Sequence, residues 1–108
     1  MMEINDAASF EKQVLQAKVP VLVDFFATWC GPCRLLGPVI TQLETALDGK
    51  ALIAKVDVDK ASDLAQQWRI FSVPTIMLFN NGQLIGAYSG ERTVEAFKNW
   101  IASKVQLG

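Results

Sequence analysis

Hydrophobic residues fall in short continuous runs that alternate with segments of helical spacing. Residues 21–27 (VLVDFFA) are apolar on both alternating faces except at Asp24, which predicts a strand buried on both sides in the middle of a sheet. Further strands are predicted at 51–59, 75–79 and 83–89, and a short one near Ile4. The Asn81-Gly82 pair predicts a hairpin turn between the last two of these strands.

Helical spacing of apolar positions marks four segments between these strands. The helices are expected from an Asn5-Asp6 cap to a point before Pro20, over 32–47, over 62–68 and from Thr93 to Val105. Pro38 lies inside the second helix and predicts a kink there, and Gly49 is expected to close it. Ser62 is the expected cap of the third helix.

The order of these elements predicts an α/β fold with a mixed central sheet of about five strands and helices on both faces. Right-handed parallel crossovers are expected for the strand-helix-strand part, with the hairpin adding an antiparallel edge. The chain has 108 residues, 51% of them hydrophobic, and contains no repeats or linker. Residues 1–108 are therefore expected to form one domain with one core.

Charge and composition narrow the function classes. Ten basic and eleven acidic residues give a net charge of −1, which argues against a nucleic-acid or anionic-membrane surface. The chain has no histidine, which excludes Ser-His and Cys-His catalysis and any His-ligated zinc site. The first twenty residues lack the apolar run of a signal peptide, and no stretch approaches the ~20 apolar residues of a membrane span. We expect a cytoplasmic protein.

The only two cysteines form Cys30-Gly31-Pro32-Cys33, between the buried strand and the next helix. A helix N-terminus carries unpaired N–H groups and partial positive charge, so Cys30 is favoured as an attacking thiolate and Cys33, one turn inside, as the resolving thiol. A structural disulfide closing so short a loop would add little stability. Half of a zinc site shared between two chains is the other alternative.

Several segments together resemble the thioredoxin family over essentially the whole chain: VDFFATWCGPC, Pro38, AKVDVD, SVPT and NNGQ, in this order. The resemblance implies the thioredoxin fold and a redox-active Cys30–Cys33 disulfide. It implies that Asp24, whose pKa burial should raise, transfers the proton of the second cysteine. It also implies that Lys55 pairs with Asp24 and tempers that rise.

The resemblance further implies a surface on which protein substrates dock. Val73-Pro74-Thr75 matches the family's cis-proline loop, with Pro74 cis and the Val73 backbone pairing with an extended substrate. The implied docking residues are Trp29, Gly31, Pro32, Val73, Pro74 and Gly90. Phe26, Gly37, Phe71 and Ser72 depart from residues common in the family; Phe71 and Ser72 shape the loop before Pro74 and bear on partner choice.

By this resemblance the chain is expected to be a protein-disulfide reductase, recharged by a thioredoxin reductase that draws on NADPH through its own flavin. The chain itself is expected to bind no cofactor or metal and to be a monomer. An oxidase or isomerase of the same fold is the first rival, disfavoured because Gly31-Pro32 carries neither charge nor His. A binding subunit that uses the same surface without turnover is the second.

Overall fold

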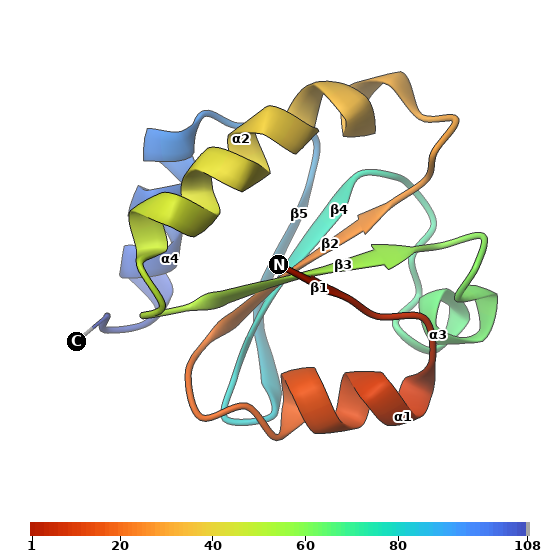
Figure 1. The fold of residues 1–108 in the computed structure, drawn as a ribbon, viewed down its shortest axis with the longest axis horizontal. Helices are drawn as coiled ribbons and strands as arrows, with labels where there is room; N and C mark the ends of the chain where they lie inside the picture. The colour runs from red at the N-terminus through yellow and green to blue at the C-terminus, as the bar shows by residue number, and fades with distance from the viewer. Residues whose placement is uncertain (108) are drawn as a thin grey trace.

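Five strands form one mixed sheet in the computed structural model, which describes residues 1–107 (Figure 1). The strands are β1 (Met2–Glu3), β2 (Val21–Phe26), β3 (Leu52–Asp57), β4 (Thr75–Asn80) and β5 (Gln83–Ser89). Their order across the sheet is β1-β3-β2-β4-β5, with β1 and β2 parallel to β3. β4 runs antiparallel to β2, and β5 antiparallel to β4. The predicted thioredoxin-type mixed sheet is confirmed.

The direction of β4 corrects the expectation of a parallel crossover from β3 to β4. β1, β2 and β3 are mutually parallel, so the connections from β1 to β2 and from β2 to β3 are both parallel crossovers, the second made by the long helix α2 (Gly31–Leu47). The next helix, α3 (Ser62–Gln67), has six residues and spans about 9 Å, less than half the length of a six-residue strand. It lies beside the end of β3 (Figure 1) and does not carry the chain back, so β4 starts at that end and runs antiparallel.

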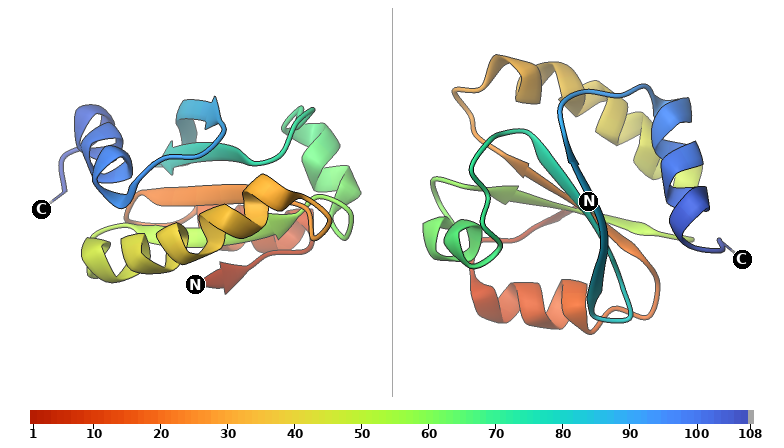
Figure 2. Two further views of the ribbon diagram at one scale, coloured as in Figure 1. Left: turned by 90° about the horizontal axis from the view of Figure 1, so that it is seen from above. Right: turned by 180° about the vertical axis from the view of Figure 1, so that it is seen from behind.

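Helices cover both faces of the sheet, as predicted. The helix α1 (Ala7–Phe10) continues as the π-helical segment η1 (Glu11–Leu15), and α4 (Val94–Lys104) is the last helix. Figure 2 shows α2 and α4 on one face and α1 and α3 on the other. Among residues 1–107, no helix has both the length and the hydropathy needed to cross a membrane.

Two helices begin at their predicted starts with a side-chain cap, whereas the cap predicted at Ser62 is wrong. Asp6 accepts the N–H of Ser9 at 2.7 Å, and Thr93 accepts that of Ala96 at 3.1 Å. Ser62 is not a cap, because α3 already begins there and Ala61 precedes it without a side-chain bond.

Two apolar clusters hold the helices against the sheet. Under α1 and α3, the rings of Phe10, Trp68 and Phe79 pack edge to face or tilted, with centroids 5.0 to 5.5 Å apart. Under α2 and α4, the buried residues are Leu22, Leu36, Ile40, Leu43, Leu47, Ala51, Ile53, Ile76, Leu78, Phe97 and Ile101. This second cluster fixes α2, which contains Cys33 and is capped by Cys30, against the centre of the sheet.

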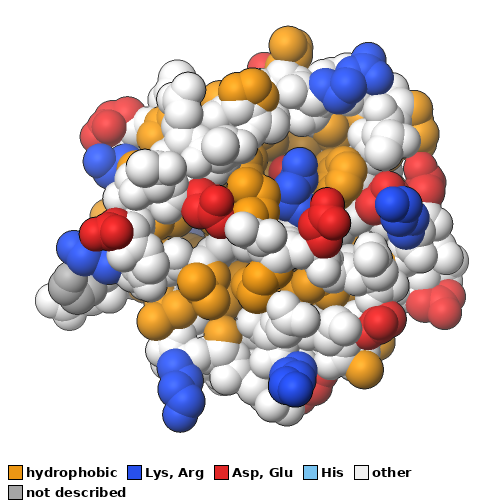
Figure 3. All heavy atoms as spheres, in the orientation of Figure 1, with side chains coloured by type: hydrophobic (Ala, Val, Ile, Leu, Met, Phe, Trp, Pro, Cys, Tyr) orange, Lys and Arg blue, Asp and Glu red, His pale blue; other side chains and the backbone are white. Residues whose placement is uncertain are grey.

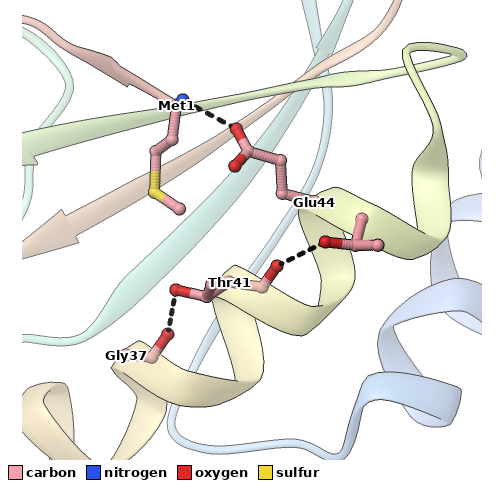
Figure 4. A network of polar contacts seen from close by, with 5 residues as sticks. Met1, Gly37, Thr41 and Glu44 are labelled. Atoms are coloured by element: carbon pink, nitrogen blue, oxygen red, sulfur yellow. Dashed lines mark hydrogen bonds and ion pairs between the residues drawn. The ribbon is translucent and has the colours of Figure 1, made fainter.

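Polar contacts along α2 surround its internal proline. Pro38 has no N–H to donate within the helix, and the hydroxyl of Thr41 bonds the Gly37 carbonyl oxygen at 3.2 Å (Figure 4). Further along, Glu44 forms an ion pair of 2.8 Å with the amino group of Met1, which ties the β1 end of the chain to the helix (Figure 4). Proline and hydroxyl back-bonding both favour bending, and the kink itself stays a prediction.

Candidate functional site

The two cysteines form a disulfide at the N-terminus of α2. The chain leaves β2 at Phe26 and turns through three residues, and the Cys30 N–H donates to the Ala27 carbonyl at 3.2 Å. Cys30 is the N-cap, with an extended backbone (φ −87°, ψ 115°), and its Cα lies 5.3 Å from that of Cys33. Both cysteines are only 5% exposed. A partner must therefore approach closely to exchange with either sulfur.

The position of Cys30 favours negative charge on its sulfur. Its Sγ accepts the Cys33 backbone N–H at 3.1 Å, one of the donors that a helix leaves unpaired at its start. The helix dipole adds partial positive charge at the same point. Pro32 occupies the first turn, where its missing N–H costs nothing. The reduced pair thus holds a thiolate best at Cys30, the chemistry of an attacking thiol.

The loop before β4 lies directly against Cys30. The Val73–Pro74 peptide bond is cis, and the Cys30 Sγ lies 3.7 Å from the Val73 carbonyl oxygen. Gly90, after β5, donates its N–H to the Pro74 carbonyl at 3.2 Å. The loop before β4 therefore adjoins the disulfide and is bonded to the segment after β5, and Val73 remains partly exposed whereas Pro74 is buried.

Trp29 forms the exposed side of this site. Its side chain is 68% exposed, yet its indole N–H donates to Asp59 Oδ2 at 2.9 Å, which fixes the ring. Trp29 and Val73 line one apolar cavity, so the loop before Cys30 and the loop before β4 share a surface. Gly31 is partly exposed and Pro32 exposed at the start of α2. The predicted docking residues Trp29, Gly31, Pro32 and Val73 therefore contribute accessible surface near the cysteines, whereas Pro74 is buried and Gly90 is partly exposed beside Pro74.

Asp24 is buried beneath α2. It shares a face of β2 with Leu22, two residues away, whose side chain packs under α2 and α4. The carboxyl group is 1% exposed and its Oδ1 has no hydrogen-bond partner within residues 1–107. Burial raises the pKa of Asp24 to about 6, and the positive charge of Lys55 offsets part of that rise. Asp24 therefore changes protonation near neutral pH.

Lys55 adjoins Asp24 without a direct ion pair between them. The two residues are register neighbours on β3 and β2, but within the described chain the ion pairs are Met1–Glu44 and Lys98–Glu95. The Lys55 Nζ lies 4.5 Å from the Phe26 ring centroid instead. Its influence on the carboxyl is thus electrostatic rather than a contact.

A cavity of about 330 Å³ connects Lys55 to the underside of the disulfide. Its lining residues are Phe26, Ala27, Thr28, Cys33, Arg34, Gly37 and Lys55. Figure 3 shows the surface hollowed between α2 and β3, with hydrophobic and basic side chains inside. The space is large enough to hold water beside Cys33.

Two contributors to the site were not predicted. Asp59 holds Trp29 from 30 residues away, and Arg34 donates to the Thr28 carbonyl at 3.2 Å across the cysteine loop. No local sequence pattern predicts the contact between Trp29 and Asp59. Across residues 1–107, no group of three or more His, Cys, Asp or Glu side chains is placed to hold a metal ion.

Comparison with known proteins agrees with this geometry. The thioredoxin family model matches residues 1–103. The chain is 42% identical over 97 residues to the thioredoxin of Chlorobaculum thiosulfatiphilum, covering 90% of this chain and 86% of that protein. It is 39% identical over 98 residues to the thioredoxin of Rickettsia felis (91% and 93%) and 40% identical over 101 residues to probable thioredoxin-2 of Caenorhabditis elegans (94% and 70%). The chain therefore belongs to the thioredoxin family of thiol-disulfide oxidoreductases.

Proposed function

We propose that this chain reduces disulfide bonds of other proteins, with Cys30 attacking and Cys33 resolving. The observation that carries the proposal is the asymmetry of the pair at the start of α2. The Cys30 sulfur accepts the Cys33 N–H at 3.1 Å, whereas Cys33 lies one turn inside the helix. Membership of the thioredoxin family supports the same assignment.

In the first step the reduced chain presents Cys30 as a thiolate. This thiolate attacks one sulfur of the substrate disulfide, forming a mixed disulfide and releasing the other substrate sulfur as a thiolate, which takes up a proton. The helix N-terminus stabilises the attacking charge.

In the second step Cys33 loses its proton and attacks the Cys30 sulfur. The Cys30–Cys33 disulfide forms, the second substrate sulfur leaves, and two electrons have passed from the chain to the substrate. We assign Asp24 as the acceptor of the Cys33 proton through water, which has room in the 330 Å³ cavity lined by Cys33 and by Lys55, the register neighbour of Asp24. Its pKa of about 6 supports this role, because the carboxylate is then ionised yet basic enough near neutral pH.

The substrate docks on the apolar surface around the disulfide, formed by Trp29, Gly31, Pro32, Val73, Pro74 and Gly90. The Val73 backbone, 3.7 Å from the Cys30 sulfur, pairs with an extended substrate segment. The positive charge of Lys55, on the neighbouring strand, favours the ionised form of Asp24 and so limits the rise of its pKa.

The cycle is completed by a thioredoxin reductase that returns two electrons from NADPH through its own flavin. We propose that this exchange takes place in the cytoplasm and that the chain acts as a monomer. The mixed composition and net charge of −1 support a surface that avoids nucleic acids and membranes.

Trapping experiments test the assignment of the two thiols. Reduced Cys33→Ser should accumulate a mixed disulfide with a protein substrate, stable on a non-reducing gel and cleaved by excess dithiol. Cys30→Ser, the matched control, should accumulate none. Accumulation by Cys30→Ser instead would reverse the roles, and absence of exchange in the unaltered chain would refute the function.

A further inference from the structure

Two large, exposed apolar side chains contribute to the lining of a cavity beside Cys30. Phe71 is 89% exposed and Trp29 is 68% exposed. The cavity has a volume of about 150 Å³ and is lined by Trp29, Val58, Ile70, Phe71, Ser72 and Val73. Val73 places it next to the disulfide, since its carbonyl oxygen lies 3.7 Å from the Cys30 sulfur. Exposed aromatic surface of this kind marks interaction sites.

The loop that carries Phe71 is held by the backbone at both ends. Arg69 adopts a left-handed conformation (φ +56°), which turns the chain out of α3, and the Ile70 N–H then donates to the Ala65 carbonyl at 2.9 Å. On the other side, the Ser72 carbonyl accepts the Thr75 hydroxyl at 2.6 Å. Phe71 is thus exposed by a fixed backbone path.

The Trp29 part of the lining is held by a side-chain contact. The Trp29 indole donates to Asp59 at 2.9 Å, and Val58, which also lines the cavity, donates its N–H to the Phe26 carbonyl at 2.9 Å. Walls fixed in this way define a cavity that exists before any partner binds. A preformed cavity avoids the entropy of ordering its walls on binding.

We propose that Phe71 is a specificity-determining residue, which with Trp29 encloses a pocket for one bulky apolar side chain of a substrate, close to the attacked cysteine. This inference rests on the proposed function, because the cavity adjoins the cysteine that attacks the substrate disulfide. The volume of about 150 Å³ matches a cavity known to bind benzene, and so fits one aromatic or branched aliphatic side chain.

The chemistry of the lining favours this occupant over a charged one. None of the six lining residues is charged, so an acidic or basic side chain would lose water without gaining an ionic partner. The chain is therefore expected to prefer disulfides flanked by a bulky apolar residue over those flanked by Ser or Asp.

The test uses reduced full-length chain and synthetic peptides whose single cysteine is disulfide-bonded to 2-mercaptoethanol. One set carries Phe or Leu at each of the two positions on either side of the cysteine, and the matched set carries Ser there. Second-order rate constants for reduction are measured by quenched flow. Bis(2-hydroxyethyl) disulfide, which has no side chain to seat, reports the exchange chemistry alone.

At one or more positions the unaltered chain should reduce the apolar peptide about 10-fold faster than the Ser peptide, the usual scale of selection by a small apolar pocket. Phe71→Ser should lower that preference to less than about 3-fold and leave bis(2-hydroxyethyl) disulfide reduction unchanged. Leu84→Ser, at a 42% exposed position on β5, is the control and should keep the full preference.

Other outcomes separate failure of the inference from failure of the function. Equal rates for both peptide sets, or a preference that survives Phe71→Ser, would overturn the pocket while leaving reduction intact. Failure to reduce even bis(2-hydroxyethyl) disulfide would overturn both. Sedimentation velocity tests the other possible occupant of the pocket, a second copy of the chain. A dimer that Phe71→Ser converts to a monomer would assign the pocket to that copy and overturn the inference.

Discussion

Replacing Asp24 with Asn removes the most deeply buried charge of the site while nearly preserving its shape. The carboxyl group is 1% exposed, and its Oδ1 has no partner in the described residues. Burial raises the pKa of Asp24 from 3.8 to about 6, against the opposing charge of Lys55. In the unfolded chain the group titrates near its ordinary value of about 3.9.

The sign of the effect follows from the two pKa values. Because the folded pKa is the higher one, the folded state binds more protons between about pH 4 and pH 6, and stability falls as pH rises through that window. The pKa difference of about 2, at about 1.4 kcal/mol per unit, gives a loss of about 3 kcal/mol. The Asn side chain stays neutral, so Asp24→Asn should be about 3 kcal/mol more stable than the parent at pH 8 and nearly equal to it at pH 4.

Urea unfolding of the oxidised proteins between pH 4 and pH 8 measures this difference. With a denaturant dependence of about 1–3 kcal/mol per molar, the midpoint at pH 8 should rise by about 1–3 M. Asp63→Asn, at an exposed position of α3, is the control and should change stability by no more than about 0.5 kcal/mol. Parallel pH profiles for the parent and Asp24→Asn would refute the assignment of a raised pKa to burial.

Three further changes test the packing and the site. Gly37→Ala should stabilise the protein by about 0.5 kcal/mol in urea unfolding, since the added Cβ meets open space. The gain is smaller than the usual helical value of about 1 kcal/mol because the ring of the following Pro38 restricts the residue before it. A loss of stability would contradict this reasoning. Gly86→Ala should destabilise the protein by about 1–3 kcal/mol, because its Cβ would lie 2.9 Å from the Trp100 ring; an unchanged midpoint would show that the ring moves freely. Asp59→Ala removes the hydrogen-bond acceptor of the Trp29 indole and should raise KM for a protein disulfide about 3-fold, with kcat and the reduction of a small disulfide unchanged. An equal loss of activity with the protein disulfide and the small disulfide would contradict a docking role for Trp29.

Local signals sufficed where one short segment determines its own structure. Asn81 and Gly82 both take positive φ values (53° and 78°), as the predicted hairpin turn requires. The caps Asp6 and Thr93 follow from side chains that bond N–H groups three residues away. The position of Cys30 at the start of α2 follows from a buried strand that meets a periodic apolar helix.

Features that depend on the relative placement of segments could not be predicted in this way. The antiparallel direction of β4 depends on α3 being too short to recross the sheet, and the periodicity of 62–68 does not fix that length. Ser is a residue type that often caps helices, which made Ser62 the expected cap. In the turn before α3, however, the bonding side chain is that of Asp57, which accepts the N–H groups of Asp59 and Lys60. The side-chain contact between Trp29 and Asp59 exists only once β2 and β3 are paired.

The reduction potential of the Cys30–Cys33 pair tests the central claim most directly. The chain is equilibrated in dithiol buffers of defined potential, and the free thiols are trapped and counted. An electron donor should give about −270 mV, the value known for thioredoxin itself and taken over rather than calculated from this structure. A value near about −120 mV, typical of a periplasmic oxidase, would contradict the account and indicate a protein that makes disulfides.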